Sequence, residues 1–349
     1  MSDIKIKISN LYKIFGDRPQ KAMEYVRGGA SKQSLLDDHK HVLGLRDINI
    51  DIPEKKIQVV MGLSGSGKST LIRHINRLIE PTEGQVVVDG EDVLAMSQDQ
   101  LRDFRRNKSS MVFQKFALLP HRTVAQNAAY GLTIQGIDDK TAENRAQHWI
   151  DRVGLGGFEN HYPAQLSGGM QQRVGLARAL ATDAEILLMD EAFSALDPLI
   201  RTDMQDILLK LQDELHKTIV FITHDLDEAL RIGDQIAILR DGESIQQGDP
   251  QDIIMRPADA YISDFIKDIN RGRVIEVRSV MSKKGKEASG PKFAHDSAIE
   301  DALQTLSSVG SDTGIVVDDN GKTIGRLEMA AAIAAMARPD RNIETPRYK

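Results

Sequence analysis

A glycine-rich loop between an apolar strand and a helix leaves few folds open to this sequence. The loop is Gly62-Leu63-Ser64-Gly65-Ser66-Gly67-Lys68-Ser69, after an apolar run at residues 56–61 and before a helical pattern at residues 69–78. Glycines let backbone N–H groups turn inward around phosphates, and the helix N-terminus adds partial positive charge. A flexible turn would rarely show this pattern in this context, so we predict a phosphate-binding loop.

Two side chains of this loop are expected to act directly on a nucleoside triphosphate. Lys68 should reach the β and γ phosphates, and Ser69 should bind Mg²⁺. The predicted phosphate-binding residues are Gly62, Ser64, Gly65, Ser66, Gly67, Lys68, Ser69 and Thr70.

The rest of the pattern indicates an α/β fold. Residues 186–189 and 219–222 are near-continuous apolar runs, typical of central parallel strands covered on both faces. Helical periodicity is present at residues 141–152 and 171–180. Because strands and helices alternate, we predict a parallel sheet. Further strands are expected at residues 4–8, 48–52, 86–88, 110–113 and 236–239.

Two carboxylates follow the apolar run at residues 186–189. Asp190 fits the acid on the metal side of a phosphate-loop NTPase, so it is a predicted Mg²⁺ ligand. Glu191 fits a base that polarises the attacking water. Two acids after a strand could instead cap the next helix. Together with the glycine loop, they favour catalysis.

A second helix also begins with an anion-binding pattern, at Leu166-Ser167-Gly168-Gly169-Met170-Gln171. Only the first of the two phosphate-binding helix starts carries a lysine. The economical explanation is that the second serves the ATP of another copy of the chain.

This second segment resembles the signature of the ABC ATPase family, and the resemblance covers residues 4–250. It implies a P-loop ATPase with a parallel-sheet core, an antiparallel subdomain and a helical subdomain. It also implies ATP and Mg²⁺ as cofactors. Contacts from one copy to the ATP of the other would come from Ser167, Gly168, Gly169 and Gln171.

The other motifs of the family follow in order. Phe15 resembles the aromatic residue that stacks on adenine, with Tyr12 as a rival and core packing as the alternative. Gln114 resembles the glutamine that senses the γ-phosphate and Mg²⁺; an ordinary polar loop residue is the alternative. Asp197 ends a segment that resembles the loop crossing the dimer. His224 resembles the switch histidine, against a purely structural role.

A helical insert near residues 18–40, broken at Gly28-Gly29, narrows the resemblance to the glycine betaine/proline betaine importer ATPases. A decorative surface helix is the alternative. Cargo of such importers includes glycine betaine, choline, carnitine, proline betaine and trimethylamine N-oxide. The resemblance implies a homodimer, integral membrane permease subunits, and a periplasmic or extracellular substrate-binding protein. It places the chain peripherally at the cytoplasmic face of the inner membrane.

The C-terminal part resembles one CBS module. We predict an ATPase domain over residues 1–272, a CBS-like region over 273–338 and a tail over 339–349. Family members often carry two such modules, so regulation through a single one stays open. The expected elements are a polar linker at 282–291, a helix at 297–308, strands at 314–317 and 323–325, and a helix at 328–337.

Composition excludes several classes of protein. The net charge of −6 gives no overall attraction to nucleic acid, and we expect no nucleic-acid partner. The absence of cysteine excludes disulfides and thiolate metal sites. The longest apolar run, residues 329–337, is far shorter than the roughly 20 residues that a membrane span takes, so transport would need a separate membrane partner.

Three alternatives remain at this point. The chain could serve an importer of an amino acid or another small solute, because the ATPase never touches the cargo. A soluble ABC ATPase acting on DNA or ribosomes would usually carry two motif sets or a coiled coil, and neither is evident. A regulatory module dominated by the CBS-like part would not need the complete set of catalytic motifs.

Overall fold

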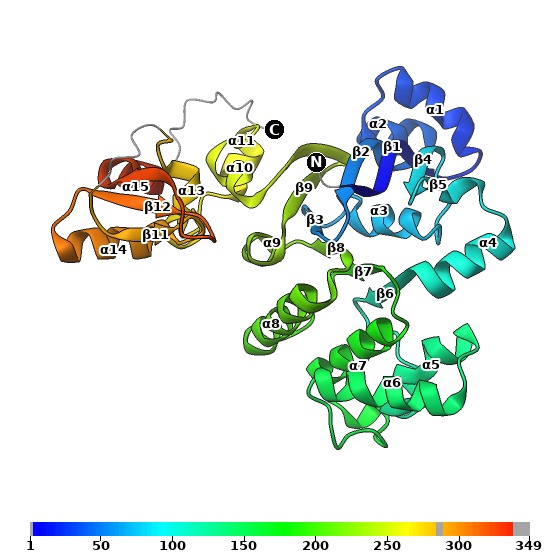
Figure 1. The fold of residues 1–349 in the computed structure, drawn as a ribbon. Coiled ribbons are helices and arrows are strands. Elements are labelled where there is room, and N and C mark those ends of the chain that lie inside the picture. Colours follow the sequence, from blue (N-terminus) through cyan, green and yellow to red (C-terminus); the bar gives the residue numbers. More distant parts are fainter. Residues whose placement is uncertain (1–2, 284–288, 338–349) are drawn as a thin grey trace. The chain divides into compact units, whose positions relative to one another are not determined.

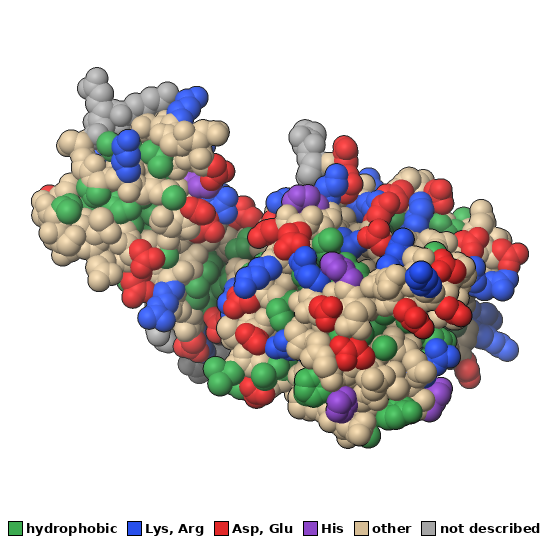
Figure 2. All heavy atoms as spheres, turned by 60° about the horizontal axis from the view of Figure 1, so that its bottom comes forward, with side chains coloured by type: hydrophobic (Ala, Val, Ile, Leu, Met, Phe, Trp, Pro, Cys, Tyr) green, Lys and Arg blue, Asp and Glu red, His purple; other side chains and the backbone are tan. Residues whose placement is uncertain are grey.

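The computed structural model describes residues 3–283 and 289–337, and the chain divides into two compact units, Met1–Gln247 and Gly248–Lys349 (Figure 1). None of the helices within the described ranges combines the length and apolar character that a membrane span requires. On the face that Figure 2 shows, Lys and Arg side chains are interspersed with Asp and Glu side chains. Neither sign of charge dominates that surface.

The first unit is built around a six-stranded sheet in the order β10-β9-β3-β8-β7-β6. Its strands are β3 (Ile57–Met61), β6 (Ser109–Phe113), β7 (Ile186–Asp190), β8 (Thr218–Thr223), β9 (Gln235–Arg240) and β10 (Glu243–Gly248). The pairs β3–β8, β3–β9, β6–β7 and β7–β8 are parallel, and β3, β7 and β8 are buried throughout. The predicted parallel sheet is confirmed.

The register of this sheet places three strand ends at one edge. Met61 of β3 pairs with Thr223 of β8, and Asp190 of β7 pairs with Ile222. The loops that follow β3, β7 and β8 therefore start close together. In open α/β sheets this edge, at the carboxyl ends of the strands, is where ligands bind.

A second, antiparallel sheet has the order β2-β1-β4-β5. Its strands are β1 (Ile4–Phe15), β2 (Val42–Pro53), β4 (Glu83–Val88) and β5 (Glu91–Asp92). Helix α3 (Lys68–Ile75) shares one buried core with both sheets. β1 and β2 are longer than the predicted segments at residues 4–8 and 48–52, because irregular pairing after Ile8 interrupts the strict alternation.

The insert between β1 and β2 contains two helices, α1 (Pro19–Arg27) and α2 (Lys32–His39). Gly28 ends α1, and Gly29 follows with a φ of 89° that favours glycine. Three buried side chains of α1 (Ala22, Met23, Val26) and Leu35 of α2 pack on Ile14 and Leu43. The insert is thus packed onto the antiparallel sheet.

A helical subdomain is formed by α5 (Val124–Gln135), α6 (Asp139–Arg152) and α7 (Gly168–Ala181), which pack against one another (Figure 1). Helix α7 begins earlier than the predicted residue 171, because the Ser167 hydroxyl accepts a hydrogen bond from the Met170 amide and caps it. The remaining helical elements are α4 (Gln98–Asp103), α8 (Pro198–Leu215), α9 (Leu226–Ile232), η1 (Val93–Ala95), η2 (Phe104–Lys108) and η3 (Pro163–Gln165).

The second unit holds a three-stranded sheet in the order β11-β12-β13, with a parallel β11–β12 pair and an antiparallel β12–β13 pair. Its strands are β11 (Lys292–Ala294), β12 (Thr313–Val317) and β13 (Thr323–Glu328). Its helices are α10 (Pro250–Met255), α11 (Ala260–Phe265), α12 (Arg271–Val274), α13 (Val277–Val280), α14 (Ile299–Val309) and α15 (Met329–Met336).

The second unit begins earlier than the domain boundary that we predicted after residue 272. Side-chain contacts explain the difference. Gln251 of α10 donates to the Val274 carbonyl and accepts from the Glu276 amide, while Arg271 donates to the Ile254 and Ala335 carbonyls. Helix α10 therefore belongs with the C-terminal elements. The single CBS-like module stays a prediction, and the tail at residues 339–349 lies outside the described residues.

Candidate active site

The glycine-rich loop follows β3 with a backbone that needs glycine at two positions. Gly62 and Gly67 have φ values of 150° and 103°. A Cβ on Gly62 would lie 2.1 Å from the Leu239 carbonyl oxygen, and one on Gly67 would lie 2.6 Å from the Gly44 oxygen. The turn is therefore closed to other residues at these points, and the loop leads directly into α3.

Lys68, the first residue of α3, folds its side chain back over the loop. Its Nζ donates to the carbonyl oxygens of Gly62, at 2.9 Å, and Leu63, at 3.1 Å. Burial lowers the pKa of Lys68, and the nearby carboxylates of Glu191 and Asp190 oppose that shift. The ammonium group thus donates its two close hydrogen bonds to loop carbonyls and lies 3.6 Å from the Glu191 carboxylate.

Ser69 and Asp190 bring together a hydroxyl and a carboxylate of the kind that bind a hard cation. The Ser69 hydroxyl donates to Asp190 Oδ1 at 2.7 Å, and Arg73 pairs with Oδ2 at 3.0 Å. The described residues hold no cluster of three or more His, Cys, Asp or Glu side chains fit for a metal. Mg²⁺ typically takes one or two carboxylates together with phosphate and water, so this small donor set fits Mg²⁺ bound with a nucleotide.

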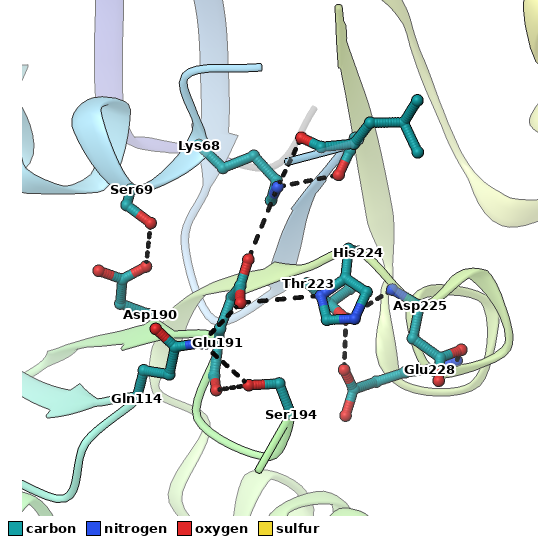
Figure 3. A network of polar contacts seen from close by, with 12 residues as sticks. Lys68, Ser69, Gln114, Asp190, Glu191, Ser194, Thr223, His224, Asp225 and Glu228 are labelled. Atoms are coloured by element: carbon teal, nitrogen blue, oxygen red, sulfur yellow. Dashed lines mark hydrogen bonds and ion pairs between the residues drawn. The ribbon is translucent and has the colours of Figure 1, made fainter. Parts of the chain in front are cut away.

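Glu191 occupies the centre of the polar network in Figure 3. Its carboxylate accepts from Gln114 Nε2 at 3.0 Å, and lies 3.6 Å from Lys68 Nζ and 3.7 Å from His224 Nδ1. The backbone of Glu191 has a φ of 46°, and its amide donates to the Ile222 carbonyl of β8. Residues other than glycine rarely adopt this left-handed backbone conformation. The fold therefore holds Glu191 in it at a cost in conformational free energy.

The loop that carries His224 is fixed by a buried carboxylate. The Thr223 hydroxyl donates to Glu228 at 2.5 Å and accepts from the Asp225 amide at 3.0 Å, and Gln205 of α8 donates to Glu228 at 3.1 Å. Burial raises the pKa of Glu228. His224 itself is 54% exposed, so its imidazole projects from a rigid base.

A cleft of about 410 Å³ runs from the glycine-rich loop to the antiparallel sheet. Phe15, at the end of β1, lines it with 39% of its surface exposed, whereas Tyr12 packs against the core of the insert. An aromatic face beside a phosphate loop suits a purine base. The lining residues are Phe15, Lys32, Val42, Leu43, Gly44, Ser64, Gly65, Gly67, Lys68, Ser69, Thr70, Gln114 and Glu191.

Comparison with known proteins agrees with this geometry. The family model described as ABC transporter matches residues 45–194. The glycine betaine transport ATP-binding protein OpuAA of Bacillus subtilis is 49% identical over 92% of this chain and 76% of its own length. The glycine betaine/proline betaine transport system ATP-binding protein ProV of Escherichia coli is 47% identical over 96% of this chain and 83% of its own length. The chain belongs to the ABC transporter ATP-binding family.

A solved structure extends the match to three dimensions. The ATP-binding cassette MJ0796, a dimer in a post-hydrolysis state bound to ADP and Pi, is 33% identical to this chain, with a TM-score of 0.60. The match covers 70% of this chain and 98% of that one. As a member of the ABC ATPase family, the chain binds and hydrolyses ATP.

The ABC signature residues lie apart from the cleft of their own chain. Ser167 and Gly168 are exposed at the start of α7, and neither they nor Gly169 are among the cleft residues that the structure describes. Asp197 accepts from the Ile200 amide at 3.1 Å and caps α8. The cleft and the signature segment are thus two separate features of the first unit.

Gln171 makes contacts within its own chain, and its expected contact with the ATP of another copy stays a prediction. Its side-chain amide donates to the Pro163 carbonyl at 3.0 Å and to the Leu166 carbonyl at 3.2 Å. These bonds hold the turn before the signature in place. A glutamine one turn into a helix can point toward a ligand or back along the chain, and here it points back.

Two residues near the site carried no sequence signal. Lys32 of the insert lines the cleft, although the insert served only as a family marker in the sequence. Arg201 of α8 pairs with Asp225 at 3.0 Å and donates to the Leu196 carbonyl at 3.2 Å. It thereby ties the segment before Asp197 to the loop that carries His224.

Proposed function

We propose that this chain is the ATP-hydrolysing subunit of an ABC importer for glycine betaine or a related quaternary amine. The observation that carries the proposal is the polar network around Glu191, where the ends of β3, β7 and β8 meet. The cargo class follows that of the relatives that match most of this chain, which serve glycine betaine and proline betaine transport. The geometry supports ATP hydrolysis, and the relatives support the cargo.

In this proposal the residues around the cleft divide the work of hydrolysis. Phe15 stacks on adenine, and Lys68 with the loop amides neutralises the β and γ phosphates. Ser69, Asp190 and Gln114 would hold Mg²⁺, which would supply positive charge to the phosphate oxygens. The loop contacts come from Gly62, Ser64, Gly65, Ser66, Gly67 and Thr70.

Glu191 positions the attacking water and accepts its proton, so that oxygen bonds to the γ-phosphorus as the bond to ADP breaks. Gln114 donates to the Glu191 carboxylate and fixes its direction. His224, 3.7 Å from the same carboxylate, completes the arrangement from β8. Positioning and charge stabilisation supply most of the catalysis.

We infer that the working form is a homodimer in which each copy completes the site of the other. Ser167, Gly168 and Gly169 present an exposed helix start that suits a phosphate. They are absent from the described lining of their own cleft, and the related cassette was solved as a dimer. Asp197 then lies at the crossing between the two copies. Gln171 holds the signature turn through its bonds to Pro163 and Leu166 and faces the ATP of the other copy.

The coupling surface is an apolar groove beside Gln114. It has a volume of about 370 Å³, and its apolar lining includes Leu78, Met111, Phe113, Tyr130 and Ile134. We propose that an integral membrane permease subunit docks here. Conformational changes driven by ATP hydrolysis would then pass to the permease. A periplasmic or extracellular substrate-binding protein would deliver the cargo through that permease. The chain would then sit peripherally at the cytoplasmic face of the inner membrane.

The test is cargo-stimulated ATPase activity of the complex with its co-encoded membrane and binding proteins in lipid vesicles. Glycine betaine, choline, carnitine, trimethylamine N-oxide and proline are assayed in turn, with the Glu191→Gln complex as the matched control. We expect one quaternary amine to stimulate the wild type and none to stimulate the variant. ATPase activity without a response to any quaternary amine would refute the proposed cargo class but not the proposed ATPase function.

A further inference from the structure

The insert between β1 and β2 is a packed structure with a defined position. Tyr25 of α1 stacks on His39 of α2, with ring centroids 3.7 Å apart and planes 12° from parallel. Met23 and Leu35 are fully buried in the core that the two helices share with β1 and β2. The side chains of the insert therefore hold fixed positions relative to the antiparallel sheet.

Polar contacts tie both ends of α2 to the rest of the first unit. At its start, Arg46 of β2 donates to the Ala30 carbonyl and also pairs with Glu243 at 3.1 Å. At its end, the His41 ring contacts the carbonyl oxygens of His39 and Asp17. The residue after the capping Ser31 is thus held in a defined place by β2.

That residue is Lys32, and its side chain reaches the phosphate loop. Nζ donates to the Gly65 carbonyl at 2.9 Å and lies 4.0 Å from an Asp241 carboxylate oxygen. The side chain is 34% exposed and lines the cleft with Phe15. Lys32 and Lys68 are the two lysines among the described cleft residues, one from α2 and the other from α3.

A neutral carbonyl is a weak partner for an ammonium group compared with a phosphate oxygen. Lys68 also rests on loop carbonyls, in a cleft where the proposed function places the phosphates. Lys32 likewise donates to a carbonyl of the same loop, that of Gly65. The nearest carboxylates are farther from the two ammonium groups, with Glu191 3.6 Å from Lys68 and Asp241 4.0 Å from Lys32. A phosphate chain in the cleft would offer both lysines a charged acceptor within hydrogen-bond distance.

We propose that Lys32 is a second nucleotide-binding cation, which contacts the phosphate chain and makes the insert a wall of the nucleotide site. This inference rests on the proposed role of the cleft. On binding, the Lys32 ammonium moves from the Gly65 carbonyl to a phosphate oxygen. Asp241 competes for the same charge, so its removal would favour the nucleotide.

The experiment measures ADP binding by titration calorimetry at low and high salt, because ADP contains the phosphates but no γ-phosphoryl group to be hydrolysed. The variants are Lys32→Met, Lys32→Arg and, as a matched control, Lys40→Met. Lys40 ends the same helix, donates to the Asp37 carbonyl and is absent from the described cleft lining. Lys68→Met identifies the site itself.

We expect Lys32→Met to weaken ADP binding about three- to tenfold at low salt, with a smaller salt dependence than the wild type. Lys32→Arg should restore both, and Lys40→Met should change neither. In a reductive-methylation footprint read by mass spectrometry, ADP should protect Lys32 and leave Lys40 unchanged. The variant Asp241→Asn should bind ADP more tightly than the wild type.

Wild-type affinity in Lys32→Met would overturn the proposal. So would weaker binding with an unchanged salt dependence and no rescue by arginine, because that result means that Lys32 only holds the Gly65 carbonyl. If Lys68→Met and the wild type bind ADP equally, the cleft is not the nucleotide site, and the proposed function fails with the inference. Loss in Lys68→Met alone leaves the function standing.

Discussion

Glu191 shows at the level of one residue how the fold surrounds a carboxylate with polar partners. Its carboxylate lies among an ammonium, an amide and an imidazole, while its backbone occupies the left-handed region. In Glu191→Gln the shape is kept but no proton can be accepted. We expect nucleotide binding to persist and ATP turnover to fall about 10²- to 10⁴-fold, measured as phosphate release. Turnover at the wild-type rate would remove Glu191 from the mechanism.

His74 of α3 predicts how stability depends on pH. Burial lowers the pKa of His74 to about 4, from 6.5 for an exposed histidine. The unfolded chain therefore binds more protons between these values, and stability falls as the pH drops from about 6.5 to about 4. The contribution is on the order of 1.4 kcal/mol per pH unit.

Urea unfolding of the wild type and of His74→Met at several pH values checks this prediction. The substitution replaces the imidazole with an apolar side chain of similar size that does not titrate. Other groups titrate in the same range, so the difference between the two slopes is the informative quantity. The variant should lose less stability on acidification than the wild type. Equal slopes would show that His74 does not titrate with folding.

The sequence predicts the site residues only where the chain itself supplies the pattern. Lys68 and Ser69 belong to one continuous loop, and Asp190 and Glu191 follow one apolar run, so the structure brings together what neighbouring residues already suggested. Lys32 meets the loop across 33 positions, and no local pattern marks such a contact. The direction of an amide on a helix is equally invisible in a sequence.

At the scale of elements, the apolar runs that become β7 and β8 were predictable because strands covered on both faces are apolar throughout. The half-exposed strands were harder to bound. β1 continues to Phe15 through irregular pairing with β2, which breaks the alternation that a sequence pattern relies on. The ends of a strand could not be predicted where backbone geometry, rather than side-chain type, decides the pairing.

Arg201 joins two loops and should act as a positioning residue. Its guanidinium binds Asp225, which follows His224, and the Leu196 carbonyl in the neighbouring loop. In Arg201→Gln we expect kcat for ATP to fall about tenfold with little change in KM, because the loops lose their alignment and the cleft does not change. Arg201→Lys should recover part of the rate.

Steady-state ATPase assays of Arg201→Gln, Asp225→Asn and the double variant test whether the pair acts as a unit. The effects should be strongly non-additive, since either change breaks the same contact. Additive losses, or a change confined to KM, would show that Arg201 does not act through this contact. Thermal unfolding of the three variants separates misalignment from loss of fold.

At the scale of the whole molecule, a dimer with shared sites makes a distinctive prediction for mixtures. Lys68→Met damages the cleft, and Ser167→Phe damages the signature, so each variant alone should be inactive. In a heterodimer, one site combines the intact cleft of one chain with the intact signature of the other. An equal mixture should regain about a quarter of the wild-type ATPase activity if the chains exchange freely.

The measurement is ATPase activity of the mixture against each variant alone, after exchange in the presence of ATP. A mixture of Lys68→Met with a second cleft variant, Ser69→Ala, is the matched control, because no intact site can form there. Regain in the control, or none in the test mixture, would contradict sites shared between copies.

The division into two units was only partly visible in the sequence. The boundary predicted after residue 272 separates α10 from its own unit, because Gln251 ties this helix to the segment around Val274. The unit in which a short helix packs depends on its side-chain contacts with residues distant in the sequence. Composition marks where the chain changes character, and contacts decide where a compact unit begins.

The junction of the insert has an evolutionary consequence. Phe15 and Val42 are paired across β1 and β2, so the segment between them leaves and re-enters the sheet at adjacent points. Lengthening such a loop adds little closure entropy, and the strand register on either side does not depend on what the loop holds. A lineage could gain the segment in a single genetic event and keep a folding protein, whereas its later loss would uncover Ile14 and Leu43. Because the segment carries a lysine to the phosphate loop, that one event would also change how the protein handles its nucleotide.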